Sequence, residues 1–268
     1  MSRIAACFTK AAAAKRTVLV PYLMGCDPDM ELSLALMHAL VEAGADMLEL
    51  GMPFSDPMAD GPVIQAASER VLAAGVRLPQ IFELAAKFRE TDQDTPLILM
   101  GYANPIEITG HEDFARQAQA AGVDGVITVD MPPEESVDLS ASFEKHAIDP
   151  IFLLSPTTPD HRIEAVTQYG RGFIYYVSLK GVTGSSQLDT GDVAERVGHI
   201  KTLTDLPVGV GFGISDPASA ASVATLADAV VVGSAIVKRI AACGTDRARL
   251  LEEVPAFVGS LRQAIDQA

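Results

Sequence analysis

Residues 208–234, VGVGFGISDPASAASVATLADAVVVGS, decide the fold because they contain one complete β/α unit. The apolar run Val208–Val210 precedes a glycine-rich turn, and helix-start residues introduce the helical segment Pro217–Leu226. A second apolar run, Ala229–Val232, follows directly. Both runs are continuously hydrophobic rather than alternating, which is typical of parallel strands that are buried on both faces. The segment therefore predicts a strand, a crossover helix and a second parallel strand.

The same kind of unit recurs along the whole chain of 268 residues. Helical segments rich in Ala, Leu and Glu separate short apolar runs, a pattern that builds a parallel sheet with right-handed crossovers. Eight candidate strands over this length favour a closed (β/α)₈ barrel, the TIM barrel; an open doubly wound sheet is the alternative. The predicted strands are Val18–Val20, Met47–Leu50, Leu97–Met100, Gly125–Val129, Ile151–Leu154, Phe173–Val177, Val208–Val210 and Ala229–Val232.

One interval, between Leu50 and Leu97, is too long for a single helix. It predicts a loop over Gly51–Gly61 and two helices, around Val63–Ala74 and Gln80–Arg89. The amphipathic tail Arg247–Ile265 is expected to close the outer ring of helices. Since no linker or low-complexity tract interrupts the pattern, residues 1–268 are expected to form a single domain.

Composition narrows the possible partners. With 49% hydrophobic residues and a formal net charge of -15, the chain can form a large core but would repel nucleic acid and anionic membranes. An anionic substrate would need local backbone dipoles to hold it. The three cysteines are far apart and lack metal-ligand spacing, and no run is apolar enough for a signal peptide or a membrane span. These features predict a cytoplasmic protein.

Barrel active sites lie at the carboxyl ends of the strands, where Glu49 interrupts an apolar run between Leu48 and Leu50. By alternation Glu49 shares a face with Met47. On the interior face its carboxyl group would be partly desolvated, which raises its pKa and makes it a usable acid or base. An outward Glu49 paired with a cation of a helix is the alternative.

The loop that follows, residues 52–61, is rich in proline and turn formers and carries two further carboxylates. Asp60 can bring a second carboxyl group to the same barrel mouth. Asp56, between Ser55 and Pro57, can equally well stabilise a turn or serve function.

The sixth strand contains adjacent tyrosines, Tyr175 and Tyr176, of which only one can face the interior. It leads into Gly181–Gly184, a segment suited to a mobile lid. Lys180 could form a Schiff base with a carbonyl substrate, but its loop position favours a solvated amine with an ordinary pKa.

Glycines after the last two strands suggest a phosphate site. Gly211, Phe212 and Gly213 follow the seventh strand, and Gly233 and Ser234 follow the eighth, where a helix begins. Such turns free backbone N–H groups, and the helix start adds the positive end of its dipole. The sequence therefore predicts an uncharged cradle of amides for an anionic group.

The run LELGMPFSDPMADG, residues 48–61, closely resembles the signature of the tryptophan synthase α subunit family. Shorter matches follow in family order over nearly the entire chain: Tyr102-Ala103-Asn104-Pro105, Asp130-Met131-Pro132, Gly181-Val182-Thr183-Gly184, Gly211-Phe212-Gly213-Ile214-Ser215 and Gly233-Ser234.

The resemblance implies a lyase that cleaves indole-3-glycerol phosphate to indole and glyceraldehyde 3-phosphate in tryptophan biosynthesis. It implies that Glu49 is the general acid and base, that Asp60 stabilises the indole N–H, and that Tyr175 positions the reacting centre. The remaining implied residues fall into two groups. The phosphate would be bound by Gly184, Gly213, Gly233 and Ser234, and the indole pocket would be shaped by Tyr22, Met100, Ile127 and Phe212.

The resemblance also implies a partner, a pyridoxal-phosphate-dependent β subunit in an α₂β₂ heterotetramer that passes indole through a tunnel. The partner-facing residues would include Pro53, Asp56, Asp130 and Pro132. No metal or cofactor is expected in this chain. Two other functions remain open: a different phosphate-binding barrel, such as a sugar-phosphate isomerase or a Schiff-base aldolase using Lys180, and a barrel that only binds and regulates its partner.

Overall fold

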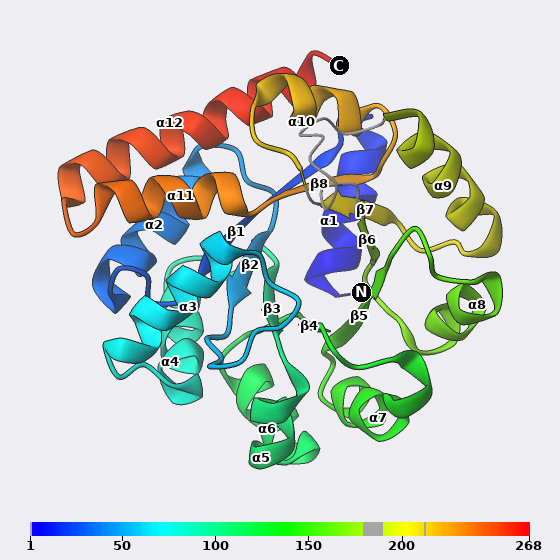
Figure 1. Cartoon of the computed structure of the whole chain (residues 1–268), viewed down its shortest axis with the longest axis horizontal. Coiled ribbons are helices and arrows are strands. Elements are labelled where there is room, and N and C mark those ends of the chain that lie inside the picture. The colour runs from blue at the N-terminus through cyan, green and yellow to red at the C-terminus, as the bar shows by residue number, and fades with distance from the viewer. Residues whose placement is uncertain (1, 179–189, 212) are drawn as a thin grey trace.

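The computed structural model describes residues 2–178, 190–211 and 213–268, and it contains a closed barrel of eight parallel strands in sequential order. Figure 1 looks down the barrel and shows the helices as a ring around the strands. The prediction of a TIM barrel is confirmed, and the open doubly wound sheet is excluded. The strands are β1 (Val18–Met24), β2 (Leu48–Gly51), β3 (Leu97–Gly101), β4 (Gly125–Thr128), β5 (Asp149–Leu154), β6 (Ile174–Val177), β7 (Val208–Gly211) and β8 (Ala229–Val232).

The helices between the strands match the predicted alternation, and the long second interval holds a loop and two helices as expected. The helices are α1 (Arg3–Ala13), α2 (Met30–Glu42), α3 (Pro62–Ala73), α4 (Leu78–Arg89), α5 (Ala103–Thr109), α6 (His111–Ala120), η1 (Pro133–Glu135), α7 (Val137–Lys145), α8 (Asp160–Tyr169), α9 (Thr190–Leu203), α10 (Pro217–Ala224), α11 (Ser234–Cys243) and α12 (Arg247–Asp266). None of the described helices is long and apolar enough to cross a membrane.

Strand β1 runs four residues further than predicted, through Pro21 to Met24. The reason is that β1 changes its pairing partner along its length. Residues up to Pro21 pair with β8, and residues from Tyr22 onward pair with β2. A proline that would end an ordinary strand thus lies where the hydrogen-bonding neighbour changes.

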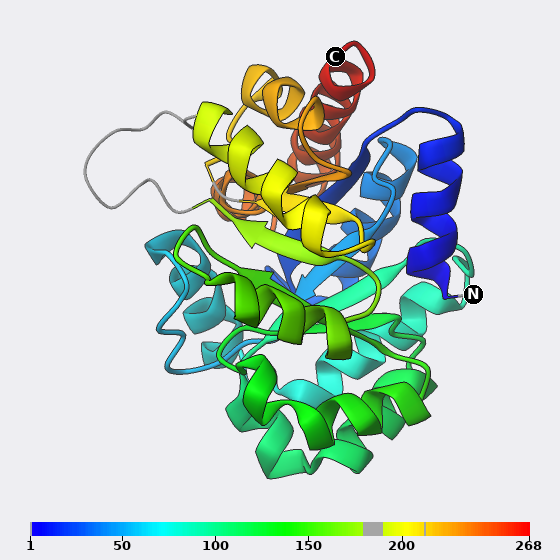
Figure 2. The ribbon, with the colours of Figure 1, turned by 90° about the vertical axis from the view of Figure 1, so that its right-hand side faces the viewer.

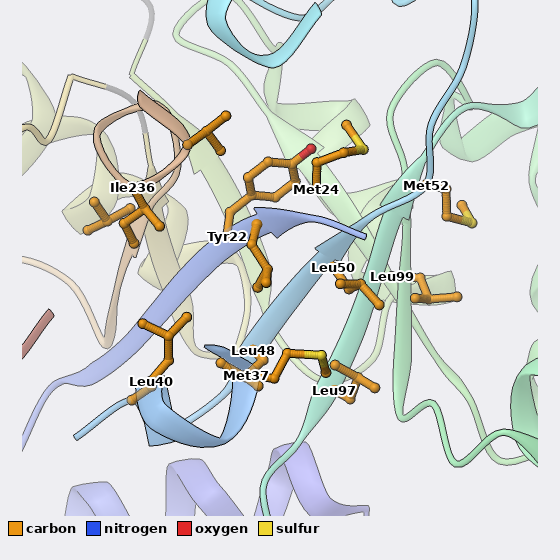
Figure 3. Close-up of a cluster of buried hydrophobic side chains, with 14 of the residues drawn as sticks. Tyr22, Met24, Met37, Leu40, Leu48, Leu50, Met52, Leu97, Leu99 and Ile236 are labelled. Atoms are coloured by element: carbon orange, nitrogen blue, oxygen red, sulfur yellow. The ribbon is translucent and has the colours of Figure 1, made fainter. Parts of the chain in front are cut away.

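Two separate apolar layers stabilise the barrel. One lies between the strands and the helices; in Figure 3, Met37 and Leu40 of α2 pack against Leu48 and Leu97 of the sheet. The other fills the barrel interior and includes Met47 of β2. Because strand side chains alternate between these layers, every position on a strand belongs either to the interior or to the helix layer.

Helix α1, which the sequence reasoning did not identify, covers the end of the barrel where the strands begin (Figures 1 and 2). Its Phe8 ring packs against Phe173, with ring centroids 5.7 Å apart, and Ile4 is fully buried in the interior layer. Helix α1 thus packs over this end of the barrel interior.

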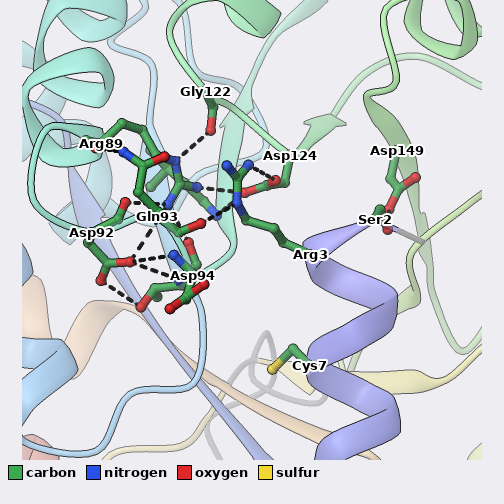
Figure 4. A network of polar contacts seen from close by, with 12 residues as sticks. Ser2, Arg3, Cys7, Arg89, Asp92, Gln93, Asp94, Gly122, Asp124 and Asp149 are labelled. Atoms are coloured by element: carbon green, nitrogen blue, oxygen red, sulfur yellow. Dashed lines mark hydrogen bonds and ion pairs between the residues drawn. The ribbon is translucent and has the colours of Figure 1, made fainter.

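Aspartate side chains bind the backbone at the start of three strands, β1, β3 and β7. Asp124 accepts a hydrogen bond from the backbone N–H of Leu97 at 2.8 Å and pairs with the buried guanidinium of Arg89 at 2.6 Å (Figure 4). Arg3 of α1 joins the same carboxylate at 2.8 Å. Asp46 and Asp228 accept the backbone N–H groups of Leu19 and Val208 in the same way. These bonds set the strand register at the closed end and so hold the opposite, open end in place.

Candidate active site

The open end of the barrel contains a cavity of about 510 Å³. Side chains at or just beyond the ends of the strands line it, together with residues of the β2–α3 loop. The residues that matter for the chemistry below are Tyr22, Glu49, Asp60, Met100, Val129, Leu153, Tyr175, Val177, Gly213, Gly233, Ser234 and Lys238. The cavity therefore lies where (β/α)₈ enzymes carry their active sites.

Glu49 points into this cavity from the interior face of β2. It is 1% exposed, and its neighbours in register are Tyr22 of β1 and Ile98 of β3. Among the residues that the structure describes, its Oε2 atom has no hydrogen-bond partner. The interior orientation predicted from alternation with Met47 is confirmed, and the outward alternative is wrong.

Burial without a partner disfavours the charged form of Glu49. Desolvation, followed by the negative charge of Asp60, raises the pKa of Glu49 to about 8. At pH 7 the carboxyl group is therefore mostly protonated. It can donate a proton and, once ionised, accept one.

Asp60 enters the cavity from the β2–α3 loop, which other elements hold in place. The Tyr102 hydroxyl accepts a hydrogen bond from the Ala59 N–H at 3.1 Å, and Gln65 donates to the Asp60 carbonyl oxygen at 2.8 Å. Ser68 of α3 hydrogen-bonds both backbone groups of Phe54. These contacts fix the position of the loop that carries the second carboxyl group.

The environment of Asp60 differs from that of Glu49. Burial raises the pKa of Asp60 to about 6, while a hydrogen bond from Tyr102 opposes the rise. At pH 7 Asp60 is thus mainly a carboxylate while Glu49 is mainly an acid. A pair of carboxyl groups with separated pKa values can divide the roles of acid and anion.

Tyr22 and Tyr175 add two hydroxyl groups to the cavity. Both are buried, and desolvation raises the pKa of each well above its ordinary value, so they remain hydrogen-bond donors. Two glycines make room for them. A Cβ at Gly51 would collide with the Tyr22 hydroxyl oxygen, and one at Gly211 would collide with that of Tyr175.

Of the adjacent tyrosines, Tyr175 faces the interior, and Tyr176 packs into the layer against the helices. The prediction that only one faces inward is confirmed. The sequence places Gly211 in the predicted phosphate turn. In the structure this position requires glycine because any larger side chain would collide with Tyr175.

The wall of the cavity is apolar. Of the residues predicted to shape an indole pocket, Tyr22 and Met100 line this cavity, whereas Ile127 is completely buried in the barrel interior and does not line it. The residues that do line it are Val129 and Leu153 together with Val177. Each lies two positions after an interior residue of its strand, so it occupies the next inward position toward the open end. All three lie within the predicted strands, so alternation along those strands could have found them.

The turns after β7 and β8, which the sequence predicts to bind phosphate, both reach the cavity, where Gly213, Gly233 and Ser234 line it. Gly213 has a φ of 76°, a value that favours glycine. Helix α11 begins at Ser234 without a side-chain cap, so its first N–H groups are available to a ligand. Gly184, Phe212 and Lys180 lie outside the described residues.

Lys238 also lines this side of the cavity. A cation therefore stands one helical turn beyond Ser234, next to the uncharged cradle of amides that the sequence predicts. In the described parts of the chain, no cluster of His, Cys, Asp or Glu side chains could hold a metal ion.

Comparison with known proteins identifies the family. The family model described as tryptophan synthase alpha chain matches residues 8–266. The tryptophan synthase alpha chain of Nitrosococcus oceani is 56% identical over 99% of this chain and 98% of that protein. The chain belongs to the tryptophan synthase alpha chain family.

Solved structures agree with this assignment. The alpha subunit of tryptophan synthase from Legionella pneumophila superposes with a TM-score of 0.94 and 44% identity, covering all of both chains. A tryptophan synthase structure from M. tuberculosis, in an aminoacrylate-bound form, gives a TM-score of 0.87 and 36% identity over 99% of this chain and 100% of that one. The predicted family and its lyase function, cleavage of indole-3-glycerol phosphate in tryptophan biosynthesis, are therefore confirmed.

The partner-facing residues predicted for this alpha chain lie in loops at the open end. Asp56 is exposed and accepts a hydrogen bond from the Ser55 hydroxyl at 2.6 Å, as a turn residue would. Asp130 accepts one from the Ala103 N–H at 2.7 Å and so links the loop after β4 to the start of α5. Pro53 and Pro132 are half-buried in the loops after β2 and β4.

Proposed function

We propose that Glu49 and Asp60 carry out the retro-aldol cleavage in this cavity, with the indole ring between them and the phosphate at Gly213, Gly233 and Ser234. The observation that carries the proposal is the buried Glu49 carboxyl group, whose Oε2 atom has no hydrogen-bond partner among the described residues and whose pKa is raised to about 8. An apolar wall suits the indole ring, and the open N-terminus of α11 suits an anionic tail.

The proposed chemistry begins with proton transfer from Glu49 to the indole carbon that bears the glycerol chain. The ring becomes positively charged, and the Asp60 carboxylate stabilises the charge through the indole N–H. The ionised Glu49 then removes the proton of the adjacent hydroxyl group. The carbonyl forms, the C–C bond breaks and its electrons neutralise the ring. Glu49 is protonated again, so the residue acts without net consumption.

Tyr175 lies on the strand opposite the two carboxyl groups and helps to position the reacting carbon. Tyr22 and Met100 bound the ring, and the proposal retains Phe212 and Gly184 as ligands of the substrate. The whole chain acts as one domain, since α12 packs against α2 and α10 and joins the two ends of the chain. In this proposal the alpha chain needs no cofactor, and its cytoplasmic location stays a prediction.

A partner surface is proposed at the same end. Among the described residues, the exposed large hydrophobic side chains are Met58 (80% exposed), Ile108 (80%) and Val137 (46%). They lie in the segments that follow β2, β3 and β4, three neighbouring strands of the barrel. Exposed apolar groups that gather beside a site indicate a protein contact. We assign this surface, with Pro53, Asp56, Asp130 and Pro132, to the pyridoxal-phosphate-dependent β subunit of an α₂β₂ complex.

An indole-release assay tests the proposed function. The purified chain, incubated with indole-3-glycerol phosphate, is expected to form indole and glyceraldehyde 3-phosphate in equal amounts, and added β subunit is expected to raise the rate. Borohydride should trap no substrate adduct. Absence of indole with or without the β subunit would contradict the lyase assignment, and a trapped adduct on Lys180 would favour a Schiff-base aldolase.

The proposed partner surface has its own test. Ile108→Asp is expected to weaken binding of the β subunit by about tenfold or more, because a charge would be buried at the contact. Indole release by the isolated variant should stay close to the wild-type rate, since Ile108 does not line the cavity. Unchanged affinity for the β subunit, measured by calorimetry, would place the contact elsewhere.

A further inference from the structure

Lys238 differs from the other residues of the phosphate side because it is charged. It lies on α11 one turn after Ser234, its side chain is exposed, and it lines the cavity together with Gly213 and Gly233. Among the described residues it is the only Lys or Arg that lines this cavity. None of the hydrogen bonds or ion pairs found among the described residues involves it, whereas the next residue, Arg239, lies over the Phe257 ring.

The position of this lysine is electrostatically unfavourable in the free protein. Side chains on a helix lean toward its N-terminus, and Lys238 lines the cavity, so its side chain extends toward the Ser234 end of α11. The same end of α11 carries the positive end of the helix dipole and uncapped N–H groups. Cations normally favour the opposite end of a helix. A chain with 35 acidic residues nevertheless provides no carboxylate for Lys238 among the described residues.

A bound anion removes this conflict. The cavity lining also contains the carboxyl groups of Glu49 and Asp60, which belong to β2 and to the loop after it rather than to α11. A ligand with an anionic tail and a head that becomes positive would be bound in one orientation only. The reversed ligand would place its anion beside Asp60 and its ring beside Lys238.

We propose that Lys238 is a specificity-determining residue of the alpha chain that selects and orients the dianionic phosphate of the substrate. The inference rests on the proposed function, because it takes the Gly213–Ser234 side as the phosphate site. In this proposal Lys238 adds a positive charge to a phosphate cradle that otherwise consists of backbone amides. The ammonium group acts on binding and orientation, and it does not contact the reacting carbon.

The test compares Lys238→Gln with Lys238→Arg and with Lys145→Gln. Lys145, on α7, is an exposed lysine paired with Glu112 and remote from the cavity lining, so its variant changes the net charge equally. Lys238→Gln is expected to raise KM, and the inhibition constant of inorganic phosphate, by about fivefold, as for an exposed ion pair. Its kcat should stay close to wild type. Lys238→Arg should restore most of the affinity, and Lys145→Gln should change neither constant.

The pH dependence adds a readout that a purely structural role would not move. The second pKa of a phosphate ester lies near 6, so wild-type affinity should rise as pH increases from about 5.5 to 7. In Lys238→Gln this rise should be much smaller. A wild-type KM and phosphate affinity in Lys238→Gln, or equal losses in Lys145→Gln, would overturn the inference. If the wild type itself bound no phosphate and released no indole, the proposed function would fail instead.

Discussion

Replacing Glu49 by Gln is expected to lower the kcat for indole formation by about a thousandfold or more, because the variant has the shape of the acid but can neither give nor take a proton. The buried site should accept the amide, since Gln is uncharged as the protonated glutamate mainly is at pH 7. Single-turnover indole release measures the effect. Binding of a glycerol phosphate analogue should change little, because the phosphate turns lie on the other side of the cavity.

A matched control for this variant is Glu83→Gln. Glu83 is an exposed residue of α4 that pairs with Lys87 and lies outside the cavity. We expect a wild-type kcat for it. If Glu49→Gln kept more than about a tenth of the wild-type kcat, Glu49 could not be the group that transfers protons in the cleavage.

Asp60→Asn should have the second-largest effect, a loss of about a hundredfold in kcat/KM. The loss follows because a neutral amide cannot stabilise the positive ring as a carboxylate does. The wild-type profile of kcat against pH, measured at saturating substrate so that ionisation of the substrate phosphate does not contribute, should be bell-shaped. Activity falls below about pH 6 as Asp60 gains a proton, and it falls above about pH 8 as Glu49 loses its proton.

The pH profile distinguishes this role of Asp60 from a structural one. In Asp60→Asn the acidic limb should disappear while the alkaline limb remains. The alkaline limb should move to a slightly lower pH, because the negative charge of Asp60 no longer raises the pKa of Glu49. Tyr102→Phe, which removes the hydroxyl bonded to Ala59 and Asp60, should give a smaller loss and keep both limbs. An Asp60→Asn profile that retained the acidic limb would assign that limb to another group.

The fold could be predicted because its signal is local. Eight apolar runs and the helices between them are visible in the sequence, and parallel pairing follows from their spacing. The sequence predictions were wrong where contacts between residues far apart in the chain determine the local structure. Strand β1 continues past Pro21 because its partner changes from β8 to β2, and α1 forms where Phe8 can pack beneath Phe173.

Part of the site could also be predicted, because its signal too is local in the sequence. Periodicity places Glu49 and Met47 on one face, but it does not say which face is inside. Tyr102 was missed as a functional residue because its role depends on Ala59, 43 residues away in the chain. The need for glycine at Gly51 likewise becomes visible only when the Tyr22 hydroxyl is in place beside it.

The most direct test of the central claim is the titration of Glu49 itself, followed by NMR of protein carrying carboxyl-labelled glutamate. The account predicts one glutamate signal that titrates with a midpoint of about 8 and is missing from the spectrum of Glu49→Gln. If instead every glutamate titrated near the ordinary value of about 4.3, Glu49 would be hydrated or paired, and it could not supply the proton that starts the cleavage.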